Sequence, residues 1–393
     1  MANILFTAPS PFNPRLGGVE SVTTLLCESL QKRGHAVYYF HHRNRDFYEN
    51  YKSPAQYFMS PSTHYGNQEN VDFYSDLIKR LEIDVVINQW GLFGDSELYN
   101  SVYNEKSSPL VLSVIHNDPI LNYDTLWYEI SRVREFSIVG LLKCIARIFL
   151  FPKIQKQFWK ERKNHFQWLC NHTHRVVLLS SAHIDSLQRL GCWEMMKEKI
   201  SVIPNPCAYV PADAYVKYKK KQVIYVGRLE NHAKQPHRLA RIWKHITHQF
   251  PDWELVFCGD GAEKEALERF CKRMGNVRFA GRVNPEDYYK TASILCLVSD
   301  FEGFPMVLPE AMSYGVVPIA YNSFAAYPDI VENEKEGIHV TPFDEVEFTS
   351  KLKELMIDES KRRALARAAI EKSRQFSLDK IVDEWELLIN DKI

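Results

Sequence analysis

A short apolar run and the turn that follows it occupy residues 293–312, which read SILCLVSDFEGFPMVLPEAM. The apolar residues 294–298 are typical of a strand buried on both faces of a parallel sheet. Pro305 and Pro309 come next, and proline is accepted in the first turn of a helix but not in its interior. The stretch therefore predicts a strand, a loop and the start of a helix, the unit that builds open α/β sheets.

Two carboxylates, Glu302 and Glu310, flank this junction with seven residues between them. We expect Glu302 in the loop beyond the carboxyl edge of the sheet, where open α/β sheets bind ligands. Glu310 is expected about one turn into the helix. The prolines lack an N–H, so the amides left at the helix start are those of Met306, Val307 and Leu308, a potential anion site. Hydroxyl-binding carboxylates around an anion site would suit a sugar linked through a diphosphate to a nucleoside.

The composition predicts a soluble enzyme with two hydrophobic cores. The chain has 393 residues, of which 45% are hydrophobic and 25% charged, and this length exceeds what one core usually holds. Lys and Arg together number 49, as do Asp and Glu, so no net field favours nucleic acid as a partner. The eight cysteines show no CxxC pair and no metal-ligand spacing, and the sequence contains no Asp-x-Asp pair to hold a metal on a diphosphate.

Neither a signal peptide nor a membrane span is predicted. The first residues lack the basic region of a signal peptide and read as a strand. The most apolar stretch, 138–151, is interrupted by Lys143 and Arg147 and is shorter than a span. The sequence therefore predicts a cytosolic protein.

Apolar runs alternate with helical patterns along the whole chain, which favours βαβ units and mostly parallel sheets. We predict two Rossmann-like domains, one at 1–210 and one at 211–375, with the last segment, 376–393, packing back on the first. The expected strands are 4–8, 36–40, 84–88, 110–115, 175–179 and 200–203 in the first domain, and 223–226, 254–258, 277–280, 293–298 and 317–320 in the second.

Two cations are expected at another loop of the second domain. Arg228 follows the strand 223–226, and Lys234 lies six residues further on. Loops in this position bind phosphate in α/β domains, and a guanidinium can bind two phosphate oxygens at once. Both residues are therefore candidates to bind a diphosphate and to stabilise it as a leaving group. The alternative is that both are solvated surface side chains, as most Arg and Lys are.

The first domain offers weaker signals. Gly17 and Gly18 lie between the first strand and the first helix, where glycine lets a ligand approach the backbone, although a Gly-Gly pair is often only a turn. Neither this pair nor Gly259-Asp260-Gly261 is a GxGxxG fingerprint, so a nicotinamide or flavin cofactor is disfavoured. His116 follows the strand 110–115 at the expected carboxyl edge, which makes it a candidate catalytic residue among 14 histidines.

A basic and aromatic stretch occupies residues 139–170. It holds seven Lys or Arg against one Glu, interleaved with phenylalanine and tryptophan. Such a stretch is typical of a face that docks on a membrane surface. The alternative is a helix whose aromatic side chains are core and whose lysines are solvated.

These residues together resemble the retaining nucleotide-sugar glycosyltransferases of glycosyltransferase family 4. The likeness covers most of the chain and is densest from 223 to 340. It implies the GT-B fold, in which two Rossmann-like domains face each other across a cleft. The sequence departs from the common family form at Pro305, often Gly, and at Pro309, often aliphatic, which affects the detailed phosphate contacts.

The resemblance also implies a role for each candidate residue. Glu302 would contact the donor sugar, Glu310 the ribose, and His116 the region of the reacting carbon. The diphosphate would be bound by Arg228 and Lys234, which with Glu302 and His116 make up the implied catalytic set. The implied donor-binding positions are Gly17, Gly18, Arg228, Lys234, Val283, Gly303, Phe304, Pro305, Met306, Val307, Leu308 and Glu310, with the backbone around Arg282 and Val283 at the base.

The activity implied is transfer of a hexose or N-acetylhexosamine from a nucleotide sugar, with UDP favoured, to a glycan acceptor. Family members need no metal, retain the anomeric configuration and use no side-chain nucleophile. We expect a lipid-linked acceptor at the inner face of the cell membrane, in capsule, lipopolysaccharide or exopolysaccharide assembly. Two other classes remain open, a UDP-sugar epimerase of the same two-domain architecture and a non-catalytic nucleotide-sugar binder.

Overall fold

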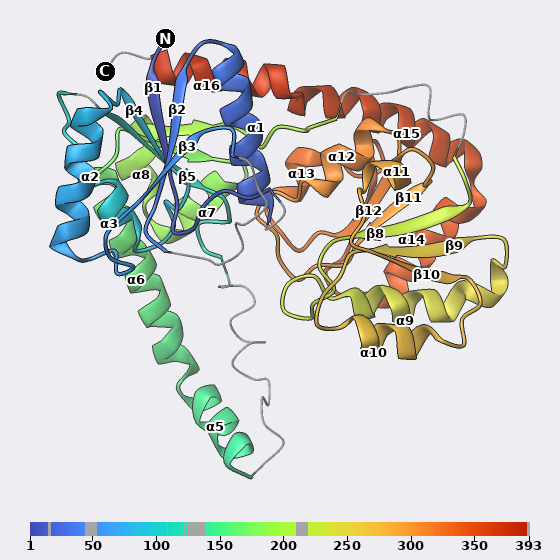
Figure 1. Ribbon diagram of the computed structural model, residues 1–393. Coiled ribbons are helices and arrows are strands. Elements are labelled where there is room, and N and C mark those ends of the chain that lie inside the picture. The colour runs from blue at the N-terminus through green and yellow to red at the C-terminus, as the bar shows by residue number, and fades with distance from the viewer. Residues whose placement is uncertain are drawn as a thin grey trace. The chain divides into compact units, whose positions relative to one another are not determined.

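The computed structural model describes residues 1–14, 17–43, 53–107, 109–121, 123, 138–209 and 219–390 (Figure 1). The chain divides into two compact units: unit 1 comprises Met1–Ile203 and Val382–Ile393, and unit 2 comprises Pro204–Ile381. The boundary predicted between residues 210 and 211 lies outside the described residues. Each unit is built on one parallel sheet, as predicted.

The described residues of unit 1 form a seven-stranded sheet in the order β3-β2-β1-β4-β5-β6-β7, and every pair of neighbours is parallel. The chain leaves β1 toward one edge and later returns to β4 on the other side of β1, so the strand order reverses between these two strands. Ligands of open α/β sheets bind outside the carboxyl ends of strands at such a reversal. The strands are β1 (Asn3–Thr7), β2 (Ala36–His41), β3 (Gln56–Met59), β4 (Val85–Asn88), β5 (Leu110–Ile115), β6 (Arg175–Leu178) and β7 (Ile200–Val202).

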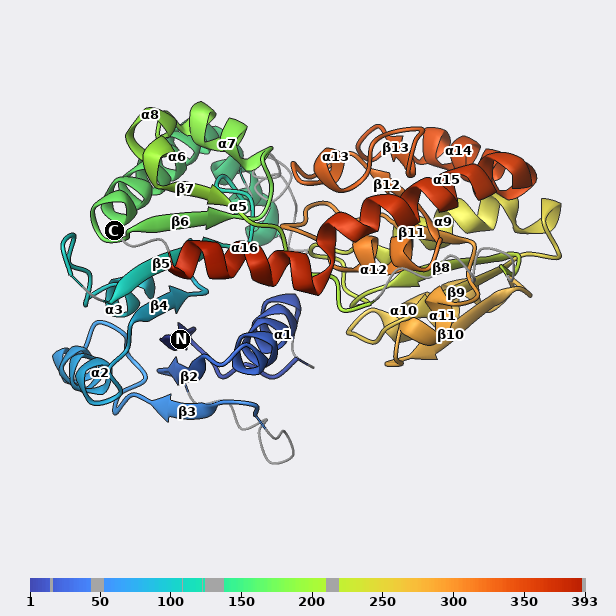
Figure 2. The same ribbon diagram turned by 90° about the horizontal axis from the view of Figure 1, so that it is seen from above.

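Helices lie on both faces of this sheet (Figure 2). The last helix, α16, begins in unit 2 and continues into unit 1, where Asp383 and Glu386 form ion pairs with Arg33, each at 2.5 Å. The helices are α1 (Gly18–Lys32), α2 (Gln68–Arg80), α3 (Ser96–Tyr99), α5 (Ile138–Phe149), α6 (Phe151–Asn171), α7 (His183–Leu190), α8 (Trp193–Met196) and α16 (Leu378–Asn390), with a 3₁₀ turn at Lys197–Lys199.

Unit 2 repeats the same plan with six parallel strands among its described residues, in the order β10-β9-β8-β11-β12-β13. Here the strand order reverses between β8 and β11. The loops after β8 and β11 therefore emerge side by side at the carboxyl edge of the sheet. The strands are β8 (Gln222–Val226), β9 (Glu254–Cys258), β10 (Val277–Gly281), β11 (Ile294–Leu297), β12 (Val317–Tyr321) and β13 (Ile338–Val340).

The core of unit 2 follows from the spacing of apolar residues along its helices. In α9, Leu239, Ile242, Trp243 and Ile246 recur at helical spacing and are at most 1% exposed, so the helix buries one face against the sheet. In Figure 1, α9 and α10 lie on one side of the sheet and α11 and α12 on the other. The helices are α9 (Pro236–Ile246), α10 (Lys264–Cys271), α11 (Glu286–Tyr289), α12 (Val307–Ser313), α13 (Tyr327–Ile330), α14 (Glu345–Ile357) and α15 (Glu359–Ser373), with 3₁₀ turns at Thr247–Gln249 and Arg374–Phe376.

The strands predicted from apolar runs are confirmed within one residue or two at each end. Two strands were not predicted, β3 and β13, and both lie at an edge of a sheet. An edge strand has one neighbour and short length, so it lacks the continuous apolar run of a central strand.

Candidate functional site

Lys234 and Glu302 form an ion pair at the reversal of the unit 2 sheet. Lys234 lies in the loop after β8 and Glu302 in the loop after β11, and Nζ is 2.6 Å from Oε1 and 2.8 Å from Oε2 of the carboxylate. The side chains are only 20% and 10% exposed. Ser299 also donates its hydroxyl to Oε1 at 2.7 Å. The structure therefore brings together two of the predicted site residues, and each neutralises the other.

A buried hydrogen-bond network holds the two loops together beneath this pair. The amide of Asp300 donates to the carbonyl of Ala233 at 2.8 Å. The Asp300 carboxylate, 5% exposed, accepts from the side chain of Gln235 at 2.6 Å and from the guanidinium of Arg238. Gln235 itself has a φ of 47°, in the left-handed region. Such local strain is tolerated where surrounding contacts fix the backbone, so Lys234 is presented from a rigid turn.

Arg228 differs from Lys234 because its side chain is 69% exposed and pairs with Glu230 at 3.1 Å. The Tyr225 hydroxyl donates to the Arg228 carbonyl at 2.8 Å, which anchors the backbone of the loop. Burial raises the pKa of Tyr225 well above its usual range, with further contributions from the charges of Glu302 and Glu230, and with Arg228 acting in the opposite direction. The charges of Arg228 and Glu302 thus both affect the pKa of the buried Tyr225. The Arg228 guanidinium itself is exposed to solvent.

Gly259 belongs to no cofactor fingerprint in the sequence, yet this residue shapes the loop after β8. Its φ is +159°, and a Cβ on it would lie 1.9 Å from the carbonyl oxygen of Gly227. The amide of Gly227 donates to the Cys258 carbonyl at 3.0 Å. No side chain fits between the two backbones, so the loops after β8 and β9 can pack only with glycine at 259. The signal that could have revealed it was a glycine directly after a predicted strand.

Glu310 lies in the first turn of α12, and its environment differs from that of Glu302. The Tyr289 hydroxyl, itself buried, donates to Oε2 of Glu310 at 3.0 Å. Burial raises the pKa of Glu310 to about 7, and the bond from Tyr289 acts in the opposite direction. The carboxyl therefore changes protonation near neutral pH. Sequence reasoning missed Tyr289, which stands in the helix before β11 rather than in either carboxylate loop.

The start of α12 provides fewer free amides than expected. The Leu308 amide donates to the Pro305 carbonyl at 3.1 Å, so it is already engaged in the first turn of the helix. Within the described residues, the amides of Met306 and Val307 have no backbone acceptor. Gly303 lies in the loop before these residues, and the Phe304 ring packs edge-on against Phe376, with ring centroids 5.6 Å apart.

Val283 follows β10 and is 37% exposed. The next residue, Asn284, lies 3.4 Å from the hydroxyl of Tyr209, whose ring contacts Tyr289 edge-on with centroids 6.0 Å apart. The contacts therefore run without interruption from the loop after β10 to Tyr289 and so to Glu310.

In unit 1, His116 follows β5, the neighbour of β4, which lies on one side of the reversal in strand order. Its Nε2 lies 2.5 Å from Oε1 of Gln89, the residue that follows β4. Burial lowers the pKa of His116 to about 4, so the imidazole is neutral at physiological pH. Gln89 was not among the residues singled out from sequence.

Gly17 and Gly18 lie at the start of α1, after β1. Gly17 precedes the first helical residue, and no side chain caps the helix there. A Cβ on Gly18 would meet no atom within 4 Å, so the backbone at this position faces open space. A ligand could approach it closely.

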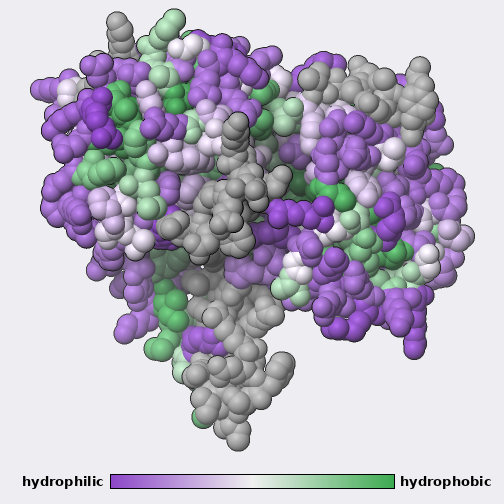
Figure 3. Space-filling view, viewed as in Figure 1, coloured by the Kyte–Doolittle hydropathy of each residue, from purple (hydrophilic) through white to green (hydrophobic). Residues whose placement is uncertain are grey.

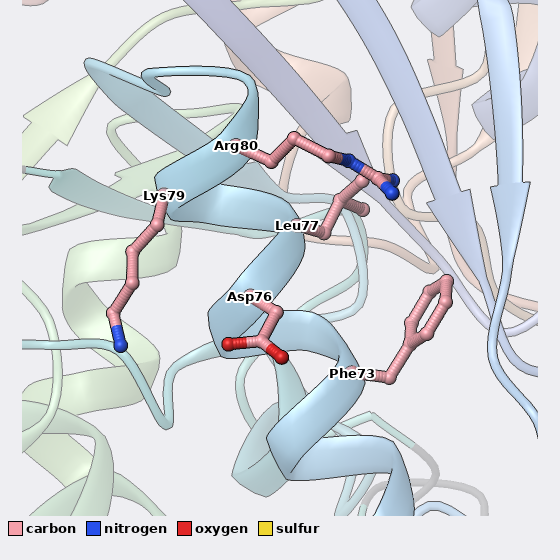
Figure 4. Close-up of a pocket in the computed structure, with 5 residues that line it drawn as sticks. All are labelled: Phe73, Asp76, Leu77, Lys79 and Arg80. Atoms are coloured by element: carbon pink, nitrogen blue, oxygen red, sulfur yellow. The ribbon is translucent and has the colours of Figure 1, made fainter.

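Elsewhere, Phe73, Asp76, Leu77, Lys79 and Arg80 of α2 line a surface hollow of about 550 Å³. In Figure 4 the five side chains come from one helix and do not converge, with Lys79 and Arg80 on opposite sides. None of the residues discussed above lines this hollow. It shows no arrangement of groups for chemistry.

Comparisons with known proteins agree with this geometry. The family model "Glycosyltransferase Family 4" matches residues 16–207, and the model "Glycosyl transferases group 1" matches residues 213–372. The two matches together cover most of the chain, with one family model in each half. The chain belongs to glycosyltransferase family 4.

Relatives and solved structures point to the same class. The chain is 29% identical over 215 residues to a Campylobacter jejuni protein named "GalNAc-alpha-(1->4)-GalNAc-alpha-(1->3)-diNAcBac-PP-undecaprenol alpha-1,4-N-acetyl-D-galactosaminyltransferase", a match covering 52% of this chain and 60% of that protein. It is similar in fold to the apo form of the lipopolysaccharide outer core galactosyltransferase WaaB (TM-score 0.68, 19% identity, 100% of both chains). It also resembles Anabaena HepE in complex with UDP and glucose (TM-score 0.71, 16% identity, 100% of both chains). These likenesses establish a GT-B type of fold.

Proposed function

We propose that this chain is a retaining glycosyltransferase that moves a hexose or N-acetylhexosamine from a UDP-linked sugar to a lipid-linked glycan in surface polysaccharide biosynthesis. The observation that carries the proposal is the carboxyl edge at the reversal of the unit 2 sheet. There Glu302 and Lys234 pair, and Glu310 follows in the first turn of α12. The names of the compared proteins support the choice of donor and acceptor, because they include UDP, a galactosyltransferase and an undecaprenol-linked substrate.

The ion pair suggests how the donor is received. The diphosphate would attract the Lys234 ammonium and the exposed Arg228 guanidinium. Hydroxyl groups of the sugar would then donate to Glu302, which loses part of its bond to Lys234. Before the donor binds, the ion pair between Lys234 and Glu302 therefore compensates the charge of each side chain. The donor would then replace the bond between them. Glu310 would accept from the ribose hydroxyls.

Transfer with retention then needs electrostatics and positioning more than a nucleophile. As the sugar–phosphate bond breaks, negative charge grows on the departing diphosphate, and Lys234 and Arg228 would stabilise it. The acceptor hydroxyl would attack from the face that the diphosphate leaves, and a phosphate oxygen would take its proton. His116, neutral at physiological pH, would contact the sugar rather than carry a positive charge.

The first experiment is a thermal-shift screen of UDP, GDP and ADP sugars against the full chain. A ligand that binds the native state raises the melting temperature by mass action, so UDP sugars are expected to give the largest rise. Incubation of the best donor with and without a lipid-linked acceptor then separates transfer from epimerisation. A glycan product with retained anomeric configuration supports the proposal. A new epimer formed from donor alone, or stabilisation by none of the nucleotides, contradicts it.

A matched pair of variants tests the site. Glu302→Gln should lower kcat by on the order of 10²-fold, since an amide cannot replace the carboxylate at the sugar. Glu334→Gln is the control, because Glu334 is also a lysine-paired carboxylate of unit 2, 2.9 Å from Lys351, but is not among the site residues. Similar kinetics in the two variants would remove Glu302 from the site.

We propose further that α5 and the first half of α6 dock on the membrane surface where a lipid-linked acceptor resides. These segments, here called the arm, extend beyond the sheet of unit 1 (Figure 1), and apolar residues lie on the arm's surface (Figure 3). Backbone bonds from Leu150 to Ala146 and from Ile154 to Leu150, each 3.0 Å, continue the helical pattern between α5 and α6. No described helix is both long enough and apolar enough to cross a bilayer.

Two groups of exposed side chains along the arm, one apolar and one cationic, support docking. On α5 and just after it, the exposed apolar side chains are Leu142, Ile145, Phe149 and Leu150, with Phe149 81% exposed. On α6 the exposed cations Lys153, Lys156 and Lys160 follow the same helical spacing. Apolar insertion combined with cations near anionic headgroups is how interfacial helices bind.

Several aromatic residues of α6 belong instead to the core of unit 1, which is the alternative interpretation of the stretch 139–170. Phe166 is fully buried, and Trp159 and Trp168 pack against the same core cluster. Trp159 also stacks on Tyr123, with ring centroids 4.3 Å apart. Trp159 within the arm, and Phe166 and Trp168 beyond it, therefore anchor α6 in unit 1. The docking surface consists of the exposed apolar side chains and lysines of the arm.

Sedimentation with vesicles of anionic phospholipid tests whether the arm binds a membrane surface. Replacement of Lys153, Lys156 and Lys160 by Gln should reduce vesicle binding by about tenfold or more, since each cation contributes about 1 kcal/mol. The control replaces three exposed lysines outside the arm, Lys32, Lys79 and Lys272, which changes the net charge equally. Equal loss in both triple variants would show that only total charge matters, and would overturn docking through the arm.

A further inference from the structure

Gln89 is held rigidly at the turn that follows β4. Its backbone amide donates to the Thr7 carbonyl of β1 at 2.9 Å, and the residue is 1% exposed. The preceding side chain, Asn88, donates to Ser96 at 3.1 Å and to Asn100 at 3.0 Å, and accepts from the Trp90 amide at 2.8 Å. Since each of these bonds is made with a buried or partly buried partner, the turn has little freedom to move.

The side chain of Gln89 meets the imidazole of His116. The amide oxygen Oε1 lies 2.5 Å from Nε2 of the ring. An amide oxygen can only accept a hydrogen bond, and a neutral imidazole carries one proton. The contact therefore requires the proton on Nε2, and it leaves Nδ1 with a free lone pair.

Nothing else in the described part of the chain competes for Nδ1. No hydrogen bond to this atom is formed there, and the atom is not among the fully buried polar atoms that lack a partner. The His116 side chain is partly exposed, so Nδ1 can meet a ligand. A lone pair of this kind accepts from a hydroxyl or N–H group and repels a carbonyl oxygen.

We propose that Gln89 is a positioning residue that holds His116 in the Nε2–H tautomer, so that Nδ1 accepts a hydrogen bond from a hydroxyl group of the bound sugar. The tautomer follows from the orientation of the Gln89 amide, whose oxygen faces the ring and whose nitrogen is buried without a partner in the described part of the chain. The identity of the ligand rests on the function proposed above. Gln89 acts through His116 and contacts no substrate itself.

Nitrogen-15 NMR of histidine-labelled full-length protein tests the tautomer directly. The His116 signals are assigned by their loss in His116→Asn. The wild type is expected to show a protonated Nε2 and an unprotonated Nδ1. In Gln89→Leu both nitrogens should move toward the average of exchanging tautomers, whereas Gln89→Glu, which also offers only acceptor oxygens, should keep the proton on Nε2. A wild type with the proton on Nδ1, or a folded Gln89→Leu with unchanged signals, overturns the proposal.

Steady-state kinetics test the second part of the proposal, the hydrogen bond from the sugar to Nδ1 of His116. Gln89→Leu is expected to lower kcat about tenfold, the value of one lost hydrogen bond, with the donor KM within twofold. The Gln89→Asn variant, whose shorter side chain withdraws the oxygen, should behave in the same way. A tautomer that shifts as expected while kcat is unchanged would overturn the role of Nδ1 toward the sugar. Absence of transfer with every donor would remove the proposed function while leaving the NMR result valid.

Discussion

Replacing Glu310 by Gln should make the protein more stable above neutral pH. Burial raises the pKa of this carboxyl from 4.5 to about 7, which disfavours its ionised form in the native state by about 3 kcal/mol relative to the unfolded chain. The side chain keeps partial solvent contact, which reduces the usable figure to about 2 kcal/mol. The amide of the variant does not ionise, and its oxygen can still accept from Tyr289.

The sign of the effect depends on pH in a defined way. Below pH 4.5 the carboxyl is protonated in both the native and the unfolded chain, so the variant gains nothing. Between pH 4.5 and 7 the Glu310 carboxyl ionises in the unfolded chain but keeps its proton in the native chain. The free-energy penalty on the native state of the parent protein therefore grows over this range. Above pH 7 it is complete. The difference between variant and parent should therefore be near zero at pH 4, partial at pH 6 and about 2 kcal/mol at pH 9.

Differential scanning calorimetry at these three pH values measures the difference, with Glu334→Gln as a control of opposite sign. Hydrogen bonds from Lys361 and Lys351 lower the pKa of Glu334, so its replacement should reduce stability at neutral pH and have no effect in acid. A Glu310→Gln variant that is no more stable than the parent at pH 9, or whose advantage is the same at pH 4, would refute the burial argument.

Three further predictions concern single contacts. Lys234→Met leaves the Glu302 carboxylate with a reduced set of donors, so urea unfolding should show a loss of about 2–3 kcal/mol, partly restored by adding Glu302→Gln. Tyr289→Phe removes the bond that lowers the pKa of Glu310, so the pH midpoint for UDP binding, followed by calorimetry, should move upward; an unchanged midpoint would contradict the assignment. Asp344→Ala removes the cap that accepts from two amides of α14 and should cost about 1 kcal/mol while leaving nucleotide affinity unchanged.

Much of the fold could be predicted because central strands of a parallel sheet are buried on both faces and therefore read as continuous apolar runs. The strand before Glu302, residues 294–297, is such a run and is fully buried apart from 2% at Leu297. The edge strand β3 is different. Its residues Gln56 and Met59 are exposed, so its pattern resembles a loop, and only pairing with β2 identifies it as a strand.

The site could be predicted in part for a related reason. Loops at the carboxyl ends of strands are recognisable once the strands are known, and this places Arg228, Lys234 and Glu302 at one edge of a sheet. Partners that come from elsewhere in the chain carry no such signal. Tyr289 lies in a short helix before β11, and it appears in the sequence only as one of 20 tyrosines.

By itself, the sequence determined which segments become strands, where the strand-to-helix turns lie and which charged side chains follow them, because these properties depend on local burial patterns and on proline and glycine. Only the tertiary structure decided the pairing of Lys234 with Glu302, the near-neutral pKa of Glu310 and the contact between Gln89 and His116. Each of these depends on distances between segments far apart in the chain and on the exclusion of water around them, and neither quantity is encoded by any single stretch of residues.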